Sequence, residues 1–271
     1  MTTSRRPFRF GAVAGVRGPA SAWTDGARRL EDDGYSTLLV PDTLWTPSPF
    51  LVLAAVAAAT TNLRLGTWVI ASALRRPAEV VREVKTLQEL SAGRVELGIG
   101  AGRPGGERDA EALGVEWGSA GARVTQVEAT VTAVRGGIDP VPRIVIAGSG
   151  DRMLGIAARM ADTLALPTPP TADLATLAAL AERARVHAGD IELAVQLTGV
   201  GDDIPAWLRH QQGLTPDGLR EAGSATMLSG DVDRDADALA ELREATGISY
   251  LTVPGELTPR VGPLVARVSG S

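Results

Sequence analysis

The stretch GTWVIASALRRPAEVVREVKTLQELSAGRVELGIGAG, residues 66–102, contains a complete strand–helix–strand unit. An apolar run leads through a loop to Arg-Arg-Pro at residues 75–77. A helical pattern follows, stops at Gly93, and gives way to a second apolar run. Proline is favoured at the first position of a helix and glycine just past its end. We therefore predict a helix over residues 77–93 that joins two parallel strands.

The same alternation of short apolar runs and longer helical patterns continues along the chain and predicts eight parallel strands. The predicted strands are residues 8–14, 36–41, 63–71, 94–100, 143–148, 162–167, 191–199 and 248–254. The predicted helices include residues 22–34, 48–61, 77–93 and 233–247, the last of which ends at Gly247. Residues 200–230 are expected to form a long excursion after the seventh strand.

Eight strand–helix units in 271 residues favour an α/β fold, a (β/α)8 TIM barrel that fills residues 1–271 as a single domain. No linker, repeat or low-complexity tract divides the chain. An open doubly wound sheet is the alternative, because it has the same alternation of strands and helices. In a barrel the active site lies at the C-terminal ends of the strands, so residues that follow the strands are the candidates for function.

The composition excludes several kinds of site and partner. The chain has no cysteine, so disulfides and thiolate metal sites are excluded, and its two histidines leave almost nothing for a histidine-based metal site. A formal net charge of −5 disfavours binding to nucleic acid or to anionic membranes. We expect a small-molecule substrate as the partner and no metal, and a homodimer is left open.

The N-terminal stretch SRRPFRF has the paired arginines of an export signal, but the run that follows is short and contains Arg17. A signal peptide needs an apolar core of about 7–15 residues, so a first strand is the preferred interpretation. No apolar run reaches the ~20 residues of a membrane span. These features predict a cytoplasmic protein without a membrane partner.

The stretch VPDTLW, residues 40–45, places a carboxylate, a hydroxyl and an indole at the end of the second predicted strand. In a barrel, Asp42, Thr43 and Trp45 would lie at the mouth, where side chains meet ligands. The alternative is a helix N-cap or a turn, since Asp and Thr are favoured there. The spacing alone does not decide between the two.

The stretch GIGAGRPGG, residues 98–106, contains Gly100, Gly102 and Gly105 in the order of a dinucleotide-binding fingerprint. That fingerprint requires an acidic residue at the end of the next strand, and RIVIAG ends without one. In a barrel, these glycines would instead allow a planar ring to approach the backbone closely.

The stretch IAGSGDRML, residues 146–154, follows the fifth strand and opens a helix. Gly148, Ser149 and Gly150 would expose backbone N–H groups at the helix N-terminus, and Arg152 would add a positive charge on the first turn. This arrangement predicts a phosphate site. The alternative is an ordinary turn with Asp151 as the N-cap.

Taken in order, these motifs resemble the luciferase-like monooxygenase family of flavin and deazaflavin barrels. The resemblance rests on G-T, the Arg-Pro loop, TLQELSAGR and LGIGAG within residues 66–102, on PRIVIAGSG at residues 142–150, and on GISY at residues 247–250. It covers nearly the whole chain. The compact length and the terminal VGPLVARVSGS resemble a short deazaflavin-associated subgroup.

The resemblance implies that FMN or the deazaflavin F420 binds at the barrel mouth. It also implies a bulge in the third strand, often with a non-prolyl cis peptide bond, that supports the ring. Counted back from Pro77, that bond falls at Trp68–Val69. Gly100 and Gly102 would lie beside the ring, and the Gly148–Arg152 turn would hold the phosphate.

Two positions depart from the family pattern. The family commonly has a histidine after Pro-Asp, and here Thr43 occupies that position beside Asp42. A hydroxyl has no pKa suited to proton transfer near neutral pH, although it can form a hydrogen bond. Arg103 replaces a glutamate found in sugar-phosphate dehydrogenase relatives, which suggests an anionic substrate or a charged cofactor tail.

The resemblance therefore implies an oxidoreductase, with F420-dependent hydride transfer to or from a small organic substrate. Asp42 and Thr43 are the expected catalytic residues, and Trp45 and Arg103 the expected substrate contacts. FMN-dependent monooxygenation is an alternative. Because a fold does not guarantee a function, a barrel that lost or changed its chemistry is another, and an NAD(P) enzyme on an open sheet is a third.

Overall fold

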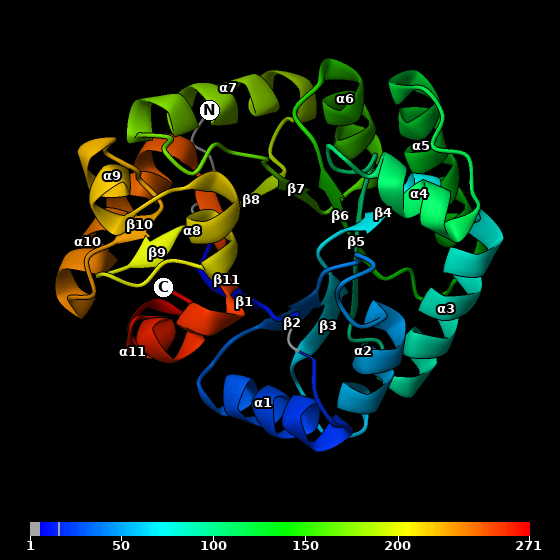
Figure 1. Cartoon of the computed structure of the whole chain (residues 1–271), viewed down its shortest axis with the longest axis horizontal. Coiled ribbons are helices and arrows are strands. Elements are labelled where there is room, and N and C mark those ends of the chain that lie inside the picture. Colours follow the sequence, from blue (N-terminus) through cyan, green and yellow to red (C-terminus); the bar gives the residue numbers. More distant parts are fainter. Residues whose placement is uncertain (1–5, 16) are drawn as a thin grey trace.

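The protein is described by a computed structural model that covers residues 6–15 and 17–271, so SRRPFRF lies partly outside the described residues. The barrel strands occupy the centre of the molecule and the helices surround them (Figure 1). The strands are β1 (Arg9–Val13), β2 (Thr37–Val40), β3 (Arg64–Thr67) with its continuation β4 (Ile70–Ala71), β5 (Val95–Gly100), β6 (Arg143–Ala147), β7 (Thr163–Ala165), β8 (Glu192–Gln196) and β11 (Ile248–Pro254).

The helices follow the strands as the sequence pattern predicts. They are α1 (Ala20–Asp32), α2 (Pro49–Ala57), α3 (Pro77–Leu90), α4 (Glu107–Leu113), α5 (Ala120–Gly137), α6 (Asp151–Met160), α7 (Leu174–Ala188), α10 (Val232–Thr246) and α11 (Thr258–Val268), with short 3-10 turns at Ser72–Leu74 and Gly255–Leu257. Pro77 starts α3, and Gly247 ends α10 with a φ of 67°. None of the helices in the described part of the chain combines the length and apolar character of a membrane span.

The sheet closes on itself, which confirms the (β/α)8 barrel and shows that the open doubly wound sheet is wrong. The strands pair in parallel in the order β3, β2, β1, β11, β8, β7, β6, β5 and β4, and β3 also pairs with β5. An open sheet would leave two edge strands, each with one unpaired side. Here β3 and β5, the third and fourth strands of the barrel, pair with each other and close the sheet.

The predicted third strand, residues 63–71, is interrupted between β3 and β4. The peptide bond Trp68–Val69 is cis, as the family resemblance implied. The Thr67 hydroxyl donates to Gly98 O at 2.7 Å and accepts from Gly98 N at 3.0 Å. A Cβ atom on Gly98 would lie 2.0 Å from Thr67 O, so the bulge requires a glycine on the neighbouring strand.

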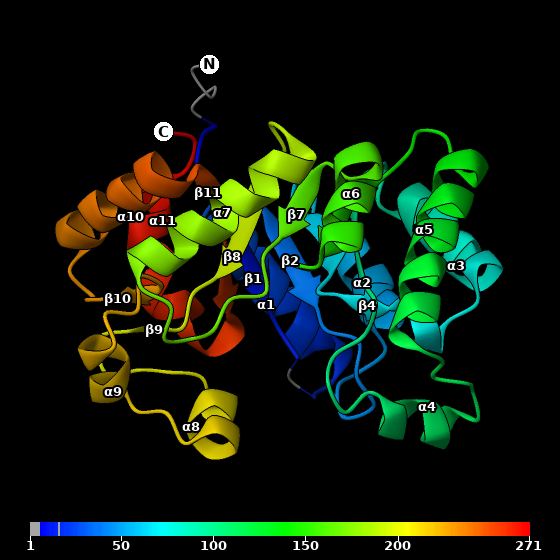
Figure 2. The ribbon, with the colours of Figure 1, turned by 90° about the horizontal axis from the view of Figure 1, so that it is seen from above.

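The excursion and the chain ends lie at opposite ends of the barrel. The excursion contains β9 (Gly199–Val200), α8 (Ala206–Gln212), α9 (Pro216–Glu221) and β10 (Met227–Leu228). Figure 2 shows α8, α9 and α4 at one end of the molecule and the C-terminus at the other, where Ser271 O accepts from Phe8 N. The excursion therefore borders the mouth, where the strands have their C-terminal ends.

The opposite end of the barrel interior is filled by a buried ion-pair network. Its members lie within the first two residues of their strands: Arg9, Arg64, Glu96, Arg143, Thr163 and Glu192. Arg9 Nη1 lies 2.9 Å from Glu96 Oε2, and Arg9 Nη2 lies 2.7 Å from Glu192 Oε2. The Tyr250 hydroxyl donates to Glu96 Oε1 at 2.9 Å, and the Arg9 guanidinium lies 3.3 Å from the centre of the Tyr250 ring.

The network shifts the ionisation of its members. Burial alone would raise the pKa of Glu192. The hydrogen bonds from Arg9 and the positive charge of Arg9 outweigh burial and hold that pKa below its ordinary value of 4.5. Burial raises the pKa of the Tyr250 hydroxyl well above 10, so it remains a hydrogen-bond donor. Removing one partner of a buried pair leaves an uncompensated charge, which is strongly destabilising.

We predict that Glu192→Gln lowers the free energy of unfolding by about 3 kcal/mol at neutral pH, because Arg9 loses a buried partner. A carboxylate whose pKa is depressed in the folded state stabilises the protein above its unfolded pKa, near 4.5. That stability is lost as the pH falls through the folded pKa. The variant should therefore show a shallower loss of stability on acidification. Denaturant unfolding between about pH 3 and pH 7 measures both effects.

The matched control is Glu89→Gln, because Glu89 is exposed and forms no ion pair among the described residues. It should change neither the stability nor its pH dependence. A Glu192→Gln protein with the wild-type acid profile would show that Glu192 is not the group that titrates.

Candidate active site at the barrel mouth

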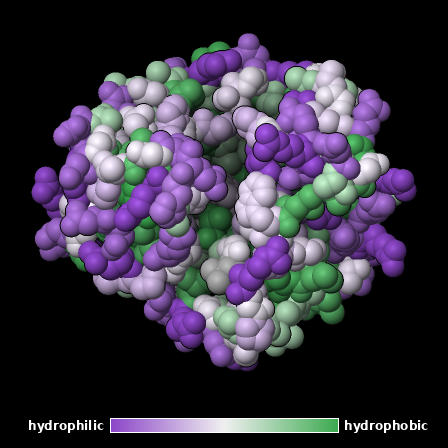
Figure 3. Space-filling view, viewed as in Figure 1, coloured by the Kyte–Doolittle hydropathy of each residue, from purple (hydrophilic) through white to green (hydrophobic). Residues whose placement is uncertain are grey.

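A cavity of about 490 Å3 opens at the C-terminal ends of β2, β4, β5 and β6. Figure 3 shows a hollow in the middle of this face. The predicted site residues that line the cavity are Asp42, Thr43, Trp68, Val69, Gly100, Gly102, Arg103, Gly148 and Ser149. The residues that do not line it are Trp45, Gly150 and Arg152. The structure thus brings together most of the candidates from four separate sequence motifs.

The glycines after β5 accommodate an indole of the chain itself. A Cβ atom on Gly102 or on Gly106 would lie 2.3 Å from the Trp117 ring, and Gly102 has a φ of +95°. The Arg123 guanidinium covers the same ring at 4.5 Å. The closed barrel also removes the open sheet on which a dinucleotide fingerprint acts, so that alternative is wrong. Sequence analysis missed Trp117, since nothing in the local pattern placed it against the glycines.

Asp42 forms a bidentate ion pair with Arg75. Arg75 Nε and Nη2 donate to the two Asp42 oxygens, each at 2.8 Å, and Arg75 Nη1 donates to Glu83 at 3.1 Å. Burial would lower the pKa of Arg75, but the hydrogen bond and charge of Asp42 outweigh burial and raise it. Both carboxylate oxygens of Asp42 are therefore engaged, and the side chain anchors the loop after β2 to the loop before α3.

Thr43 combines the two interpretations of its position. Its hydroxyl lies 2.9 Å from the Thr46 hydroxyl, and Thr46 N donates to Thr43 Oγ1 at 3.2 Å. The Thr46 hydroxyl also contacts Pro41 O at 3.1 Å. Thr43 therefore forms the turn that was the alternative interpretation of this position. It also lines the cavity, as the mouth interpretation predicted.

Arg103 bridges two loops at the rim of the cavity. Its Nη2 lies 2.6 Å from Asp109 Oδ2, and its guanidinium lies 4.3 Å from the centre of the Trp45 ring. Trp45 is 55% exposed and does not line the cavity, and this contact joins it to the rim. The guanidinium side chain is 39% exposed, so a charged ligand group can still approach it.

The turn before α6 has two unpartnered backbone donors, and of their two residues Ser149 lines the cavity. Gly148 N donates to Ala165 O at 3.3 Å, whereas the N–H groups of Ser149 and Gly150 have no hydrogen-bond partner among the described residues. Gly150 is the N-cap of α6, so the alternative with Asp151 as the N-cap is wrong. Arg152 points toward α5, where it donates to Gly121 O and Thr125 Oγ1.

A smaller cavity of about 270 Å3 adjoins the first and shares Trp68, Val69, Ala147 and Pro167 with it. Trp68 Nε1 donates to Gln196 Oε1 at 3.3 Å. Gln196 and Trp207 line only this second cavity. Sequence analysis missed both residues. The excursion in which Trp207 lies was recognised, but its path back to the mouth was not.

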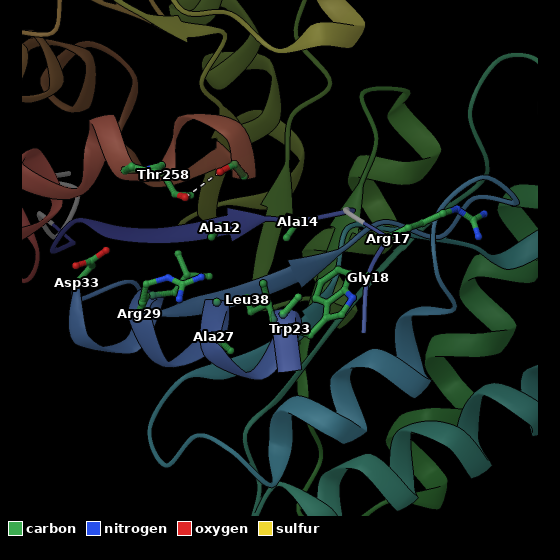
Figure 4. A pocket seen from close by; sticks show the side chains of 15 residues that line it. Ala12, Ala14, Arg17, Gly18, Trp23, Ala27, Arg29, Asp33, Leu38 and Thr258 are labelled. Atoms are coloured by element: carbon green, nitrogen blue, oxygen red, sulfur yellow. Dashed lines mark hydrogen bonds between the residues drawn. The ribbon is translucent and has the colours of Figure 1, made fainter. Parts of the chain in front are cut away.

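Another cavity, of about 410 Å3, lies outside the barrel. Figure 4 shows Trp23 and Ala27 of α1 near Ala12 on β1 and Leu38 on β2, with the hydrogen bond from Thr258 to Gly255 beside them. Small side chains on α1 leave this space beneath the helix. None of the predicted site residues lines it, so we assign the active site to the mouth.

The fold and the glycine-lined mouth define the class as a parallel eight-stranded barrel with a ligand site at the strand ends. The family model described as luciferase-like monooxygenase matches residues 7–136 of the chain. The resemblance to this family is thereby confirmed. Its members are oxidoreductases and monooxygenases.

Among curated proteins, the chain is similar to phthiodiolone/phenolphthiodiolone dimycocerosates ketoreductase of Mycobacterium sp. (strain JLS). The identity is 33% over 153 residues, which is 47% of this chain and 40% of the relative. The matches cover less than half the length of the first curated relatives, between 17% and 40%.

Solved structures share the fold over nearly the whole chain. A riboflavin lyase with modified FMN and riboflavin has a TM-score of 0.76 at 15% identity, with 97% of this chain and 91% of that chain covered. An F420-dependent secondary alcohol dehydrogenase with an F420–acetone adduct has a TM-score of 0.72 at 18% identity, with 97% and 98% covered. At these identities the likeness concerns the fold alone.

We predict that Asp42 and Arg75 act as one structural unit. Arg75→Met should lower the free energy of unfolding by about 3 kcal/mol, because the Asp42 side chain, 12% exposed, loses its partner. Asp42→Asn should also destabilise, and the double variant should cost clearly less than the two losses added together. Denaturant unfolding of the three variants closes this double-mutant cycle.

The control is Asp25→Asn, which breaks an ion pair with Arg28 whose two side chains are each 55% exposed. Exposed pairs contribute little, so its effect should be small. Additive losses for Asp42 and Arg75 would contradict a structural unit and would free Asp42 for another role.

Proposed function

We propose that the protein is an oxidoreductase that binds F420, or alternatively FMN, in the mouth cavity and exchanges a hydride with a small organic substrate. The observation that carries this proposal is the cavity itself. It is about 490 Å3, has small residues on one wall, and ends at free backbone N–H groups. Relatives and structural neighbours described as ketoreductase and F420-dependent dehydrogenase support the same chemistry.

The residues of the cavity fit such a cofactor. A volume of 300–1,000 Å3 suits a ligand of this size, and the floor is apolar at Val69, Ile70, Leu74 and Met153. The unpartnered N–H groups of Ser149 and Gly150 lie at the N-terminus of a ten-residue helix, where the helix dipole favours a phosphate.

When bound, the deazaflavin supplies a ring carbon that takes up or releases a hydride. The chain contributes position and environment. In this proposal Ser149 and Gly150 hold the phosphate, and the bulge at Trp68–Val69 supports the ring. Arg103, stacked on Trp45, attracts an anionic group at the rim. A role for Arg152 would require it to leave its partners on α5.

A second candidate is a barrel that binds the cofactor but has lost or changed the redox chemistry. The observation that favours it is the shortage of proton donors. Asp42, Arg103 and Asp109 are the titratable residues that line the cavity, and both carboxylates are ion-paired. Under the first candidate, the proton therefore comes from solvent or from the substrate.

Filling the cavity tests the cofactor. Ala147 points into the barrel on β6 and lines both cavities, so Ala147→Leu should weaken cofactor binding at least about tenfold by occupying the ring space. The control Ala54→Leu makes the same change in a groove between α2 and α3 and should leave binding unchanged. Titration of F420 and of FMN, followed by absorbance, measures both affinities. The proposed function would be overturned if neither F420 nor FMN bound the wild-type protein.

Restoring the family's histidine tests the proton source. Wild-type turnover should show no titration near pH 6.5, because the cavity lining contains no histidine. Thr43→His should introduce one near its ordinary pKa of about 6.5. The control Thr43→Ser keeps the hydroxyl that bonds Thr46. Steady-state rates across pH decide the question, and a wild-type profile that already bends near pH 6.5 would contradict the expectation.

A further inference from the structure

The cavity beside the mouth has a polar group with no partner. The indole N–H of Trp68 can only donate, so the Gln196 atom that it contacts at 3.3 Å is the amide oxygen. This fixes the orientation of the amide. Gln196 Nε2 then has no hydrogen-bond acceptor within the described residues, although Gln196 is half-buried and lines the cavity. An amide N–H that has no protein acceptor and belongs to a residue lining the cavity is available to donate to a bound ligand.

A second unpartnered group lies at the same level of the barrel. Thr252 is the register partner of Gln196 on β11 and is 0% exposed. Its hydroxyl forms no hydrogen bond within the described residues. Strand alternation places Thr252 on the same inward face as Tyr250, one layer nearer the mouth. By contrast, the Thr198 hydroxyl lies 3.2 and 3.3 Å from two other hydroxyls and is satisfied.

The walls of this cavity are uncharged and include two indole rings. None of its twelve lining residues carries a charge. Trp68 lies on one strand end and Trp207 comes from α8 in the excursion, and both line the space. Indole faces favour stacking with planar rings. A charged ligand group would lose its hydration here without gaining a counter-charge.

We propose that this cavity binds an uncharged planar ring that carries a carbonyl group, and that Gln196 Nε2 donates to the carbonyl oxygen. Two sources fit this chemistry, a ring of the substrate or the carbonyl edge of the cofactor ring. Assigning the ring to the substrate rests on the proposed function. The expectation that the cavity binds a neutral ring with a carbonyl group rests on the cavity lining alone. Arg103 at the rim then receives the anionic group, so one ligand system spans a charged and a neutral region.

The test uses benzamide and benzoate, which share one ring but differ in charge, with ligand-detected NMR on the cofactor-free protein. Wild-type protein should bind benzamide and discriminate against benzoate. Gln196→Glu keeps the acceptor for Trp68 Nε1 but removes the donor, so the benzamide Kd should rise about five- to tenfold, the value of one hydrogen bond. Trp207→Ala should weaken benzamide binding by removing one wall.

His210→Ala is the control, because His210 lies on α8 with Trp207 but does not line the cavity. Equal binding of benzoate, no binding of benzamide, or an unchanged Kd in Gln196→Glu would overturn the proposal. Adding saturating F420 or FMN separates the sources. Displaced benzamide assigns the cavity to the cofactor ring, and retained benzamide assigns it to the substrate. If neither cofactor binds, the proposed function fails while the benzamide result still decides this inference.

Discussion

The constraint on which the structure depends is the filling of the barrel interior. Eight strands enclose a space that side chains must occupy, because a closed barrel core is packed rather than hollow. At the N-terminal end, Arg9 pairs with Glu96 and Glu192 and fills the space with charge. The middle layer is filled by Tyr250, Leu39 and Val145. Small residues follow at the C-terminal end, so the filled lower layers support an open mouth.

The mouth itself is organised by arginines that neutralise its carboxylates. Arg75 engages Asp42 on one side, and Arg103 engages Asp109 on the other. Asp42 and Arg75 follow different strands, whereas Arg103 and Asp109 both follow β5. The same contacts that shape the cavity engage both of its carboxylates. Under the proposed function, such a site would stabilise charge and orient ligands, and proton transfer would be left to groups outside the chain.

Sequence reasoning located the strands and most of the mouth because both depend on local signals. Apolar runs mark the strands, and Gly148 and Ser149 follow one of them directly. It could not foresee the Asp42–Arg75 pair, which joins residues 33 positions apart, or the direction of Arg152, which α5 determines. Gln196 appeared as one polar residue at the end of an apolar strand. Only the closed barrel shows that the Gln196 amide nitrogen and the Thr252 hydroxyl lie at the same level without a hydrogen-bond partner in the described part of the chain.

The positions of the tryptophans follow from the small side chains at the mouth, which leave space that other residues must enclose. Only 4% of the residues are aromatic, yet Trp45, Trp68, Trp117 and Trp207 of the five tryptophans lie around it. Glycine and alanine at the strand ends cannot form walls by themselves, and large rigid rings can do so with few rotatable bonds. Arg103 and Arg123 cover two of these rings and keep them oriented. Trp45, which the VPDTLW motif predicted at the mouth, stacks on Arg103 at the rim. The cavity walls themselves take Trp68, Trp117 and Trp207 from distant segments, and no single motif predicted that arrangement.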